Sequence, residues 1–295
     1  MFVVHHDKMD SETKTELSSL NDEFEQSTLR QMLLRFRRLK EHRFLVAQLV
    51  KVNIKRTYKR SFIGWSWLII APIFSVIAWV VLHGAGIMNP GDTEIPYPAY
   101  VLLSTSIFSF FLGSYQASSN ALMEGARLMV TVRFPHEVLV AERIVVHLIN
   151  FIIPFLINII VLLFYGVSFS WISILFPLTL LPLLALGLSL GVFVALLRVV
   201  AVDLARIMDR LLQFTMFITP VIYAPKVTMP ILAQIVDYNP LTYLLGFSRQ
   251  LLISGEFYEP IAYTFCIVLS LFLFLIGFGI FTKFERKLIE RMINV

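Results

Sequence analysis

The 295-residue chain contains a single cysteine, Cys266, so no disulfide can form within it. It has no GxxxxGK[ST] phosphate loop, which predicts that the chain does not hydrolyse ATP by itself. Its six histidines show no spacing typical of a metal site, and no Ser-His-Asp or Cys-His set stands out. The sequence therefore offers no pattern that favours catalysis or metal binding.

Charged residues are also scarce, at 15% of the chain against 57% for hydrophobic residues. Six apolar stretches fill most of the sequence, at roughly 62–82, 97–122, 144–165, 171–197, 211–224 and 261–282. Most approach or exceed the ~20 residues that an α-helix needs to cross the ~30 Å hydrocarbon core. The runs are continuous rather than alternating, which disfavours a β-barrel. We therefore expect an all-α, polytopic membrane protein with six transmembrane helices.

Buried acids are missing from these stretches. Apart from His83 and His147, spans one to four and six contain no ionisable group other than Tyr and Cys. Ion-coupled transporters place acidic side chains inside the membrane. Ion-driven transport is thus disfavoured, and an external energy source is implied.

Charge is distributed unevenly along the chain. Residues 1–28 carry seven acids and two lysines, whereas residues 29–60 carry eleven Lys/Arg and one Glu. The first segment is typical of a disordered acidic tail, and the second of a cytoplasmic amphipathic interface helix attracted to membrane lipids. Nucleic-acid binding is the weaker interpretation, because no recognition motif accompanies the basic block. Lys and Arg then alternate between loops, which predicts a six-span domain at 61–284, a tail at 285–295 and both termini cytoplasmic.

The fifth span is short, because only about fifteen uncharged residues separate Arg210 from Lys226. A helix that begins near Val202 would place Asp203, Arg206 and Arg210 on one face. Two interpretations remain open: these charges lie at headgroup depth and pair locally with Asp209, or they line the cytoplasmic mouth of a polar path.

The segment 225–260 holds two short apolar pieces, Pro230–Val236 and Leu241–Ile253, separated by Asn239-Pro240. Each is about half a bilayer long, and an X-Pro break between them predicts an external re-entrant helical hairpin. The alternative is a folded external loop. In span four, Gly187 and Gly191 predict close helix packing.

Several stretches, in order, resemble one known family. They are Arg56-Thr-Tyr-Lys-Arg-Ser-Phe-Ile-Gly-Trp-Ser-Trp67, Arg133-Phe-Pro-His-Glu137, Thr219-Pro-Val-Ile-Tyr-Ala-Pro225, Asn239-Pro-Leu-Thr-Tyr243 and Phe247-Ser-Arg249. Together they are similar to type-2 ABC transporter permeases of the branch that exports bacterial polysaccharides such as O-antigen, capsule and teichoic acid. The chain departs from the family in its acidic tail, in Phe62-Ile63 before the glycine, and in its short fifth span.

The resemblance implies a dimer of this chain in the bacterial cytoplasmic (inner) membrane, with two copies of a separate ATP-binding subunit. ATP and Mg would belong to those subunits, and this chain would carry no cofactor. The loop 124–141 would be the ATPase coupling segment, with contacts from Arg127, Arg133, Phe134, Pro135, His136 and Glu137. The residues expected at the membrane interface are Arg56, Tyr58, Trp65 and Trp67.

The resemblance also implies a lipid-linked polysaccharide as substrate, threaded through a pore at the dimer centre. Aromatic rings can stack on the C–H faces of sugars without holding them tightly. The candidate path residues are Phe108, Phe111, Tyr115, Phe214, Phe217 and Tyr223, and the candidate outer gate residues are Tyr238, Tyr243 and Arg249. The phenylalanines could equally face lipid or the core, and Arg249 could meet phosphate headgroups.

Three other functions remain as alternatives. The nearest is a type-2 ABC permease for a drug or a lipid. A membrane-embedded glycan-synthesis enzyme would need clusters of acids, His or Arg in its external loops, and the loops here are poor in them. A structural membrane scaffold would have no evident use for the hairpin.

Overall fold

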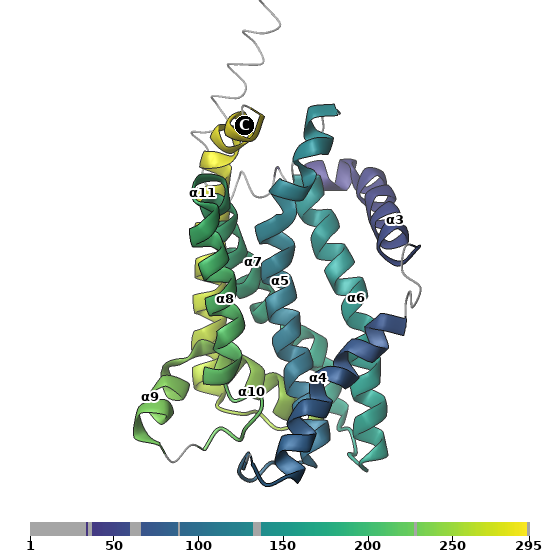
Figure 1. Cartoon of the computed structure of the whole chain (residues 1–295), viewed down its shortest axis with the longest axis vertical. Helices are drawn as coiled ribbons and strands as arrows, with labels where there is room; N and C mark the ends of the chain where they lie inside the picture. The colour runs from purple at the N-terminus through teal and green to yellow at the C-terminus, as the bar shows by residue number, and fades with distance from the viewer. Residues whose placement is uncertain are drawn as a thin grey trace, which may run out of the picture.

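In the part of the chain that the structure describes, six helices lie side by side and alternate in direction (Figure 1). They are α4 (Trp67–Gly84), α5 (Tyr97–Thr131), α6 (Glu137–Phe164), α7 (Phe176–Val200), α8 (Val202–Ile218) and α11 (Pro260–Ile293). The structure is a computed structural model, and it describes residues 34, 37–59, 66–87, 89–131, 137–226 and 229–293. Over these residues the secondary structure is helical, without strands, as the apolar runs predict.

The remaining described helices lie at the two ends of the bundle. Helix α3 (Arg43–Lys59) packs on α6 at the end where α5 finishes and α6 begins (Figure 1). The 3-10 helix η2 (Trp171–Leu175), α9 (Pro230–Tyr238) and α10 (Pro240–Ile253) lie at the opposite end. The acidic tail predicted at residues 1–28 lies outside the described residues.

Four of the described helical segments are long and apolar enough to cross a membrane. They are Tyr97–Ala121, Val138–Phe164, Trp171–Val200 and Pro260–Ile280. The protein is therefore a multi-pass membrane protein. Helices α4 and α8 span 18 and 17 residues, and they run alongside these four.

Helix α7 forms the centre of the bundle, and its most extensive contacts are with α5 and α11. Its glycines let α5 approach closely, because a Cβ added at Gly187 would lie 2.7 Å from the Phe111 carbonyl oxygen. One turn on, a Cβ at Gly191 would collide with the Tyr115 carbonyl, and Ser118 nearby donates a hydrogen bond of 3.0 Å to the Leu188 carbonyl. The packing role predicted for this glycine pair is confirmed.

The segment after α8 contains the two predicted half-length helices. Asn239 separates α9 from α10, and its side chain caps α10 by accepting a hydrogen bond from the Leu241 amide. Pro240 occupies the first turn of α10, where its missing N–H costs nothing. Most of α10 is buried against α5, α7 and α11, whereas α9 is largely exposed.

Some helices are longer than the sequence predicts. Helix α5 continues to Thr131 and α6 starts at Glu137, so both helices extend into the stretch 124–141 where the coupling segment is predicted. Residues 121–130 are rich in Ala, Leu, Met, Glu and Arg, which are strong helix formers. Helix α11 likewise continues to Ile293, through the expected tail. Helix α8 does begin at Val202, but it ends at Ile218 rather than near Ala224.

Candidate functional site

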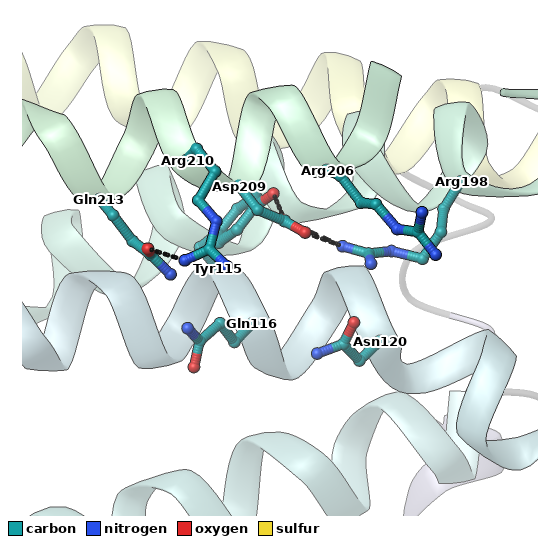
Figure 2. A pocket seen from close by; sticks show the side chains of 8 residues that line it. All are labelled: Tyr115, Gln116, Asn120, Arg198, Arg206, Asp209, Arg210 and Gln213. Carbon is teal, nitrogen blue, oxygen red and sulfur yellow. Dashed lines mark hydrogen bonds and ion pairs between the residues drawn. The ribbon is translucent and has the colours of Figure 1, made fainter. Parts of the chain in front are cut away.

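A polar pocket opens between α5, α7 and α8 (Figure 2). Its volume is about 340 Å³. It is lined by Tyr115, Gln116, Asn120, Arg198, Arg206, Asp209, Arg210 and Gln213. Such a concentration of charge and amide groups is unusual beside helices that are otherwise apolar, and it marks the pocket as the candidate functional site.

The local sequence explains why these side chains meet. Only Ala201 separates the end of α7 from the start of α8, so Arg198 in the last turn of α7 reaches back to Asp209 on α8. On α8, Arg206, Arg210 and Gln213 recur at helical spacing and share one face. The facing turns of α5 supply tyrosine and amide side chains to the same space (Figure 2).

One hydrogen-bonded chain joins the three helices. Arg198 Nη2 lies 2.9 Å from Asp209 Oδ1 and 3.0 Å from Oδ2, and the Tyr115 hydroxyl donates to Oδ1. The side chains of Arg198 and Asp209 are 16% and 27% exposed, so this ion pair is mostly shielded from solvent. Removing one partner of a shielded ion pair leaves an uncompensated charge, which strongly destabilises the protein. The network of Arg198, Asp209 and Tyr115 therefore holds α7, α8 and α5 in place relative to one another.

The other cations of the pocket are less fully neutralised. Arg206 pairs with Asp203 at 3.3 Å, and both side chains are exposed. Arg210 donates to the neutral Gln213 amide at 3.0 Å. With Arg198 and Asp209 the pocket region holds three arginines and two aspartates, which leaves a formal charge of +1. The predicted local pairing with Asp209 is therefore wrong: Arg206 pairs with Asp203, and Asp209 pairs with Arg198 of α7.

The predicted path aromatics fall into two groups. Phe108, Phe111 and Tyr115 are buried among core side chains, and only the Tyr115 side chain reaches the pocket. Phe214 and Phe217 are exposed on α8, with ring centroids 5.3 Å apart, and Tyr223 donates to the Phe217 carbonyl. The structure does not bring the two groups together in one chain, and their role along a path stays a prediction.

Three amide residues of the pocket, Gln116, Asn120 and Gln213, escaped the sequence prediction. Gln116 and Asn120 lie one turn apart on α5 and face the arginines of α8 (Figure 2). Amide side chains at helical spacing inside an apolar span were the available signal, and a search limited to ionisable and aromatic residues passes over them.

The candidate gate residues lie at the other end of the bundle. Arg249 is only 4% exposed, so it does not meet headgroups: its guanidinium donates to Ser104 Oγ and the Pro220 carbonyl and lies 4.4 Å from the Tyr100 ring centroid. Tyr238 is exposed, and Tyr243 is half-buried and donates to the Asp237 carbonyl. The gating role of these three residues stays a prediction.

Burial raises the pKa of Tyr258, in the loop after α10, above its ordinary value. Its ring packs so closely on Gly246 that a Cβ there would lie 2.8 Å from Tyr258 Cε1. Tyr258 therefore remains a neutral side chain, and it packs against the middle of α10.

Most of the predicted ATPase contacts cannot be placed. Arg133, Phe134, Pro135 and His136 lie outside the described residues, as does Trp65. Arg127 lies in α5 and Glu137 is the first residue of α6. Of the other interface residues, Tyr58 lies in α3, Arg56 is exposed there, and Trp67 is exposed at the start of α4. In the described part of the chain, no group of three or more His, Cys, Asp or Glu residues could hold a metal ion.

Comparison with known proteins identifies the family of this chain. Residues 46–253 match the family model described as ABC-2 type transporter. The O-antigen export system permease protein RfbA of Myxococcus xanthus is 30% identical over 192 residues, which cover 65% of this chain and 73% of that protein. Two proteins of the same name from Klebsiella pneumoniae are 23% and 24% identical, each over 83% of this chain and 94% of its own length. The family match covers more than half of the chain, and the chain therefore belongs to the ABC-2 type transporter family.

Proposed function

We propose that this chain is the transmembrane subunit of an ABC exporter that moves a lipid-linked polysaccharide across the bacterial inner membrane. Two copies of the chain form the path, and two separate ATP-binding subunits bind ATP and Mg²⁺ and drive transport. The family match and the names of the O-antigen export relatives support this proposal. It also agrees with the lack of a phosphate loop in the chain.

The observation that carries the proposal is a polar face on α5 and α8. Gln116, Arg206, Arg210 and Gln213 are exposed on the single chain, although the helices around them are apolar. A charged or amide side chain that faces lipid is costly, so this face is better matched to water and a polar substrate. A second copy placed against it by a twofold axis would enclose a polar path between the two chains.

The same face suits a glycan that is linked to lipid through phosphate. Arg206 and Arg210, which carry the excess positive charge, would bind the phosphate. A guanidinium group can donate two parallel hydrogen bonds to two oxygens of one phosphate. Further along α8, the exposed rings of Phe214 and Phe217 would offer sugar-stacking surfaces. Weak stacking permits a polymer to advance, whereas many strong hydrogen bonds would hold it in place.

We place six crossings in the membrane, with α4 and α8 in addition to the four long helices. At 1.5 Å per residue these two span about 27 and 26 Å, close to the ~30 Å core. The end that carries α3 would be cytoplasmic, because Lys and Arg gather there. On this orientation α9 and α10 are external, and the burial of α10 among α5, α7 and α11 supports a re-entrant hairpin.

The test measures glycan location in a strain that lacks this gene. Surface-labelled polysaccharide is compared with the lipid-linked polymer retained inside the cell, before and after complementation. A bare surface together with an internal pool is the expected result. An unchanged surface with no internal pool would overturn polysaccharide export and favour a drug or lipid permease. Loss of both pools would point to glycan synthesis instead.

A variant pair ties the result to the pocket. Arg206→Gln with Arg210→Gln should lower export at least tenfold while the protein level is unchanged. Lys40→Gln with Lys226→Gln removes the same charge from two exposed sites outside the pocket and should export normally. Equal export by both double variants would contradict the assignment of the path to this face.

A further inference from the structure

A second pocket lies between α3 and α6, at the end of the bundle away from the hairpin. Its volume is about 560 Å³. It is lined by Arg43, Val46, Ala47, Val50, Lys51, Ile54 and Lys55 of α3 and by Val145 of α6. We call it the α3 groove. None of the residues discussed for transport lines it.

The floor of the α3 groove is apolar. Val46, Val50 and Ile54 follow one another at four-residue spacing, so they form a single row along α3, and Val50 is only 8% exposed. Val145 of α6 faces this row. Such a floor accepts a hydrocarbon chain and offers no hydrogen bonds to a polar one.

A polar contact fixes the wall of the groove. Asn53 Nδ2 donates to Glu142 Oε1 at 2.7 Å, which fastens α3 to α6. Glu142 is 4% exposed and also pairs with Arg143 at 3.3 Å. The carboxylate is thus satisfied within the protein, and it does not draw the cations of the groove toward α6.

The rim of the groove is cationic. Arg43, Lys51 and Lys55 are exposed, and they lie in one row with Ala47 at the remaining four-residue position. Among the described residues, none of these three cations forms an ion pair. The small side chain of Ala47 leaves the row open in the middle, so a ligand can pass from the cations to the floor.

We infer that the α3 groove binds one anionic phospholipid of the surrounding bilayer, with an acyl chain on the floor and its phosphate against Lys51 and Lys55. The row from Arg43 to Lys55 extends about 18 Å at 1.5 Å per residue, a length that suits an acyl chain. Charge complementarity selects the headgroup, since three cations without a described partner face a leaflet that carries acidic lipids. The site does not depend on what the protein transports.

The acidic first 28 residues of the same chain are the main rival occupant, because they also carry complementary charge. They carry few apolar residues at helical spacing, Leu17, Leu20 and Phe24, so they fill a floor of valine and isoleucine less well than an acyl chain does. A phospholipid matches both the apolar floor, through its acyl chain, and the cationic rim, through its phosphate. The experiment below distinguishes the phospholipid from the acidic segment.

The test measures lipid retention by the purified full-length chain in native mass spectrometry. Mixed micelles carry phosphatidylglycerol or zwitterionic phosphatidylethanolamine with identical acyl chains. The wild type should retain one phosphatidylglycerol per chain and bind it at least tenfold more tightly than phosphatidylethanolamine. Lys51→Gln should weaken phosphatidylglycerol binding about fivefold, the effect of about 1 kcal/mol for one cation near an anionic surface. Ala47→Trp should abolish retention with every charge intact, because the indole fills the opening.

Lys40→Gln is the matched control, since Lys40 is an exposed cation of the preceding helical turns and does not line the groove. It should change phosphatidylglycerol binding less than twofold. Equal losses in Lys40→Gln and Lys51→Gln would mean diffuse attraction and would overturn the site. Equal retention of the two lipids, or normal retention by Ala47→Trp, would overturn it too. A photo-crosslinker placed at Val46 in the otherwise unchanged chain should capture lipid, and capture of residues 1–28 would assign the groove to the tail.

Discussion

The contacts of α7 with α5 and α11 lead to a testable prediction. Each contact includes a glycine, and the space available for an added methyl group differs between the two. Alanine at Gly187 would place its Cβ 2.7 Å from the Phe111 carbonyl oxygen, a backbone atom that cannot move without shifting α5. Alanine at Gly277, on α11, would find its nearest neighbour on α7 at 3.4 Å, which is an ordinary contact. Both positions lie inside helices, so both substitutions gain about 1 kcal/mol of helix propensity.

The difference between the two variants isolates the cost of overpacking. Extra atoms in a well-packed core cost about 1–3 kcal/mol. Gly277→Ala should therefore stabilise the protein by up to about 1 kcal/mol, whereas Gly187→Ala should destabilise it by about 0–2 kcal/mol. Thermal unfolding of the detergent-solubilised protein, followed by intrinsic fluorescence, measures both. If Gly187→Ala unfolds at the same temperature as Gly277→Ala, the close approach of α5 and α7 described above is wrong.

Three further tests probe the polar contacts. Asp209→Asn should lower the free energy of unfolding by about 2 kcal/mol, which is less than the loss expected on breaking a fully buried ion pair. Adding Arg198→Leu should recover most of that loss in the same melting assay. No recovery would argue against the pairing of Arg198 with Asp209. Arg249→Met should cost about 2–4 kcal/mol, because a hydroxyl and a carbonyl lose their donor, and limited proteolysis should then cut the hairpin faster than in the wild type. Asn53→Ala should loosen α3, because Glu142 loses a donor, and the spin-label distance distribution between α3 and α6 should broaden; an unchanged distribution would contradict this role.

The sequence predicted the features that depend on local chemistry. The break at Asn239-Pro240 and the close packing at the glycines of α7 follow from residues whose backbone behaviour is distinctive. The start of α8 at Val202 follows from charged residues that recur at helical spacing. The all-helical fold followed from continuous apolar runs that no soluble core could bury.

The orientation of individual aromatic side chains could not be predicted in the same way. Phe111 is fully buried and Phe214 is 61% exposed, yet both stand in apolar stretches. Lipid is as apolar as a protein core, so composition does not separate the face that packs from the face that meets lipid. The burial of Arg249 was equally hidden, because it depends on atoms of Ser104 and Pro220, 145 and 29 residues away in the chain.

The lengths of α5 and α11 have a mechanical consequence. With 35 and 34 residues they are about 50 Å long, so each exceeds the ~30 Å hydrocarbon core by about 20 Å. Proline interrupts the interior of α6 and α7, at Pro154 and Pro182, but α5 and α11 have proline only in their first turns. The two long helices therefore act as stiff levers, and their contacts with α7 serve as the fulcrum. A sideways push at the end of the bundle that carries α3 would therefore be transmitted along both helices to the opposite end, where both contact α10.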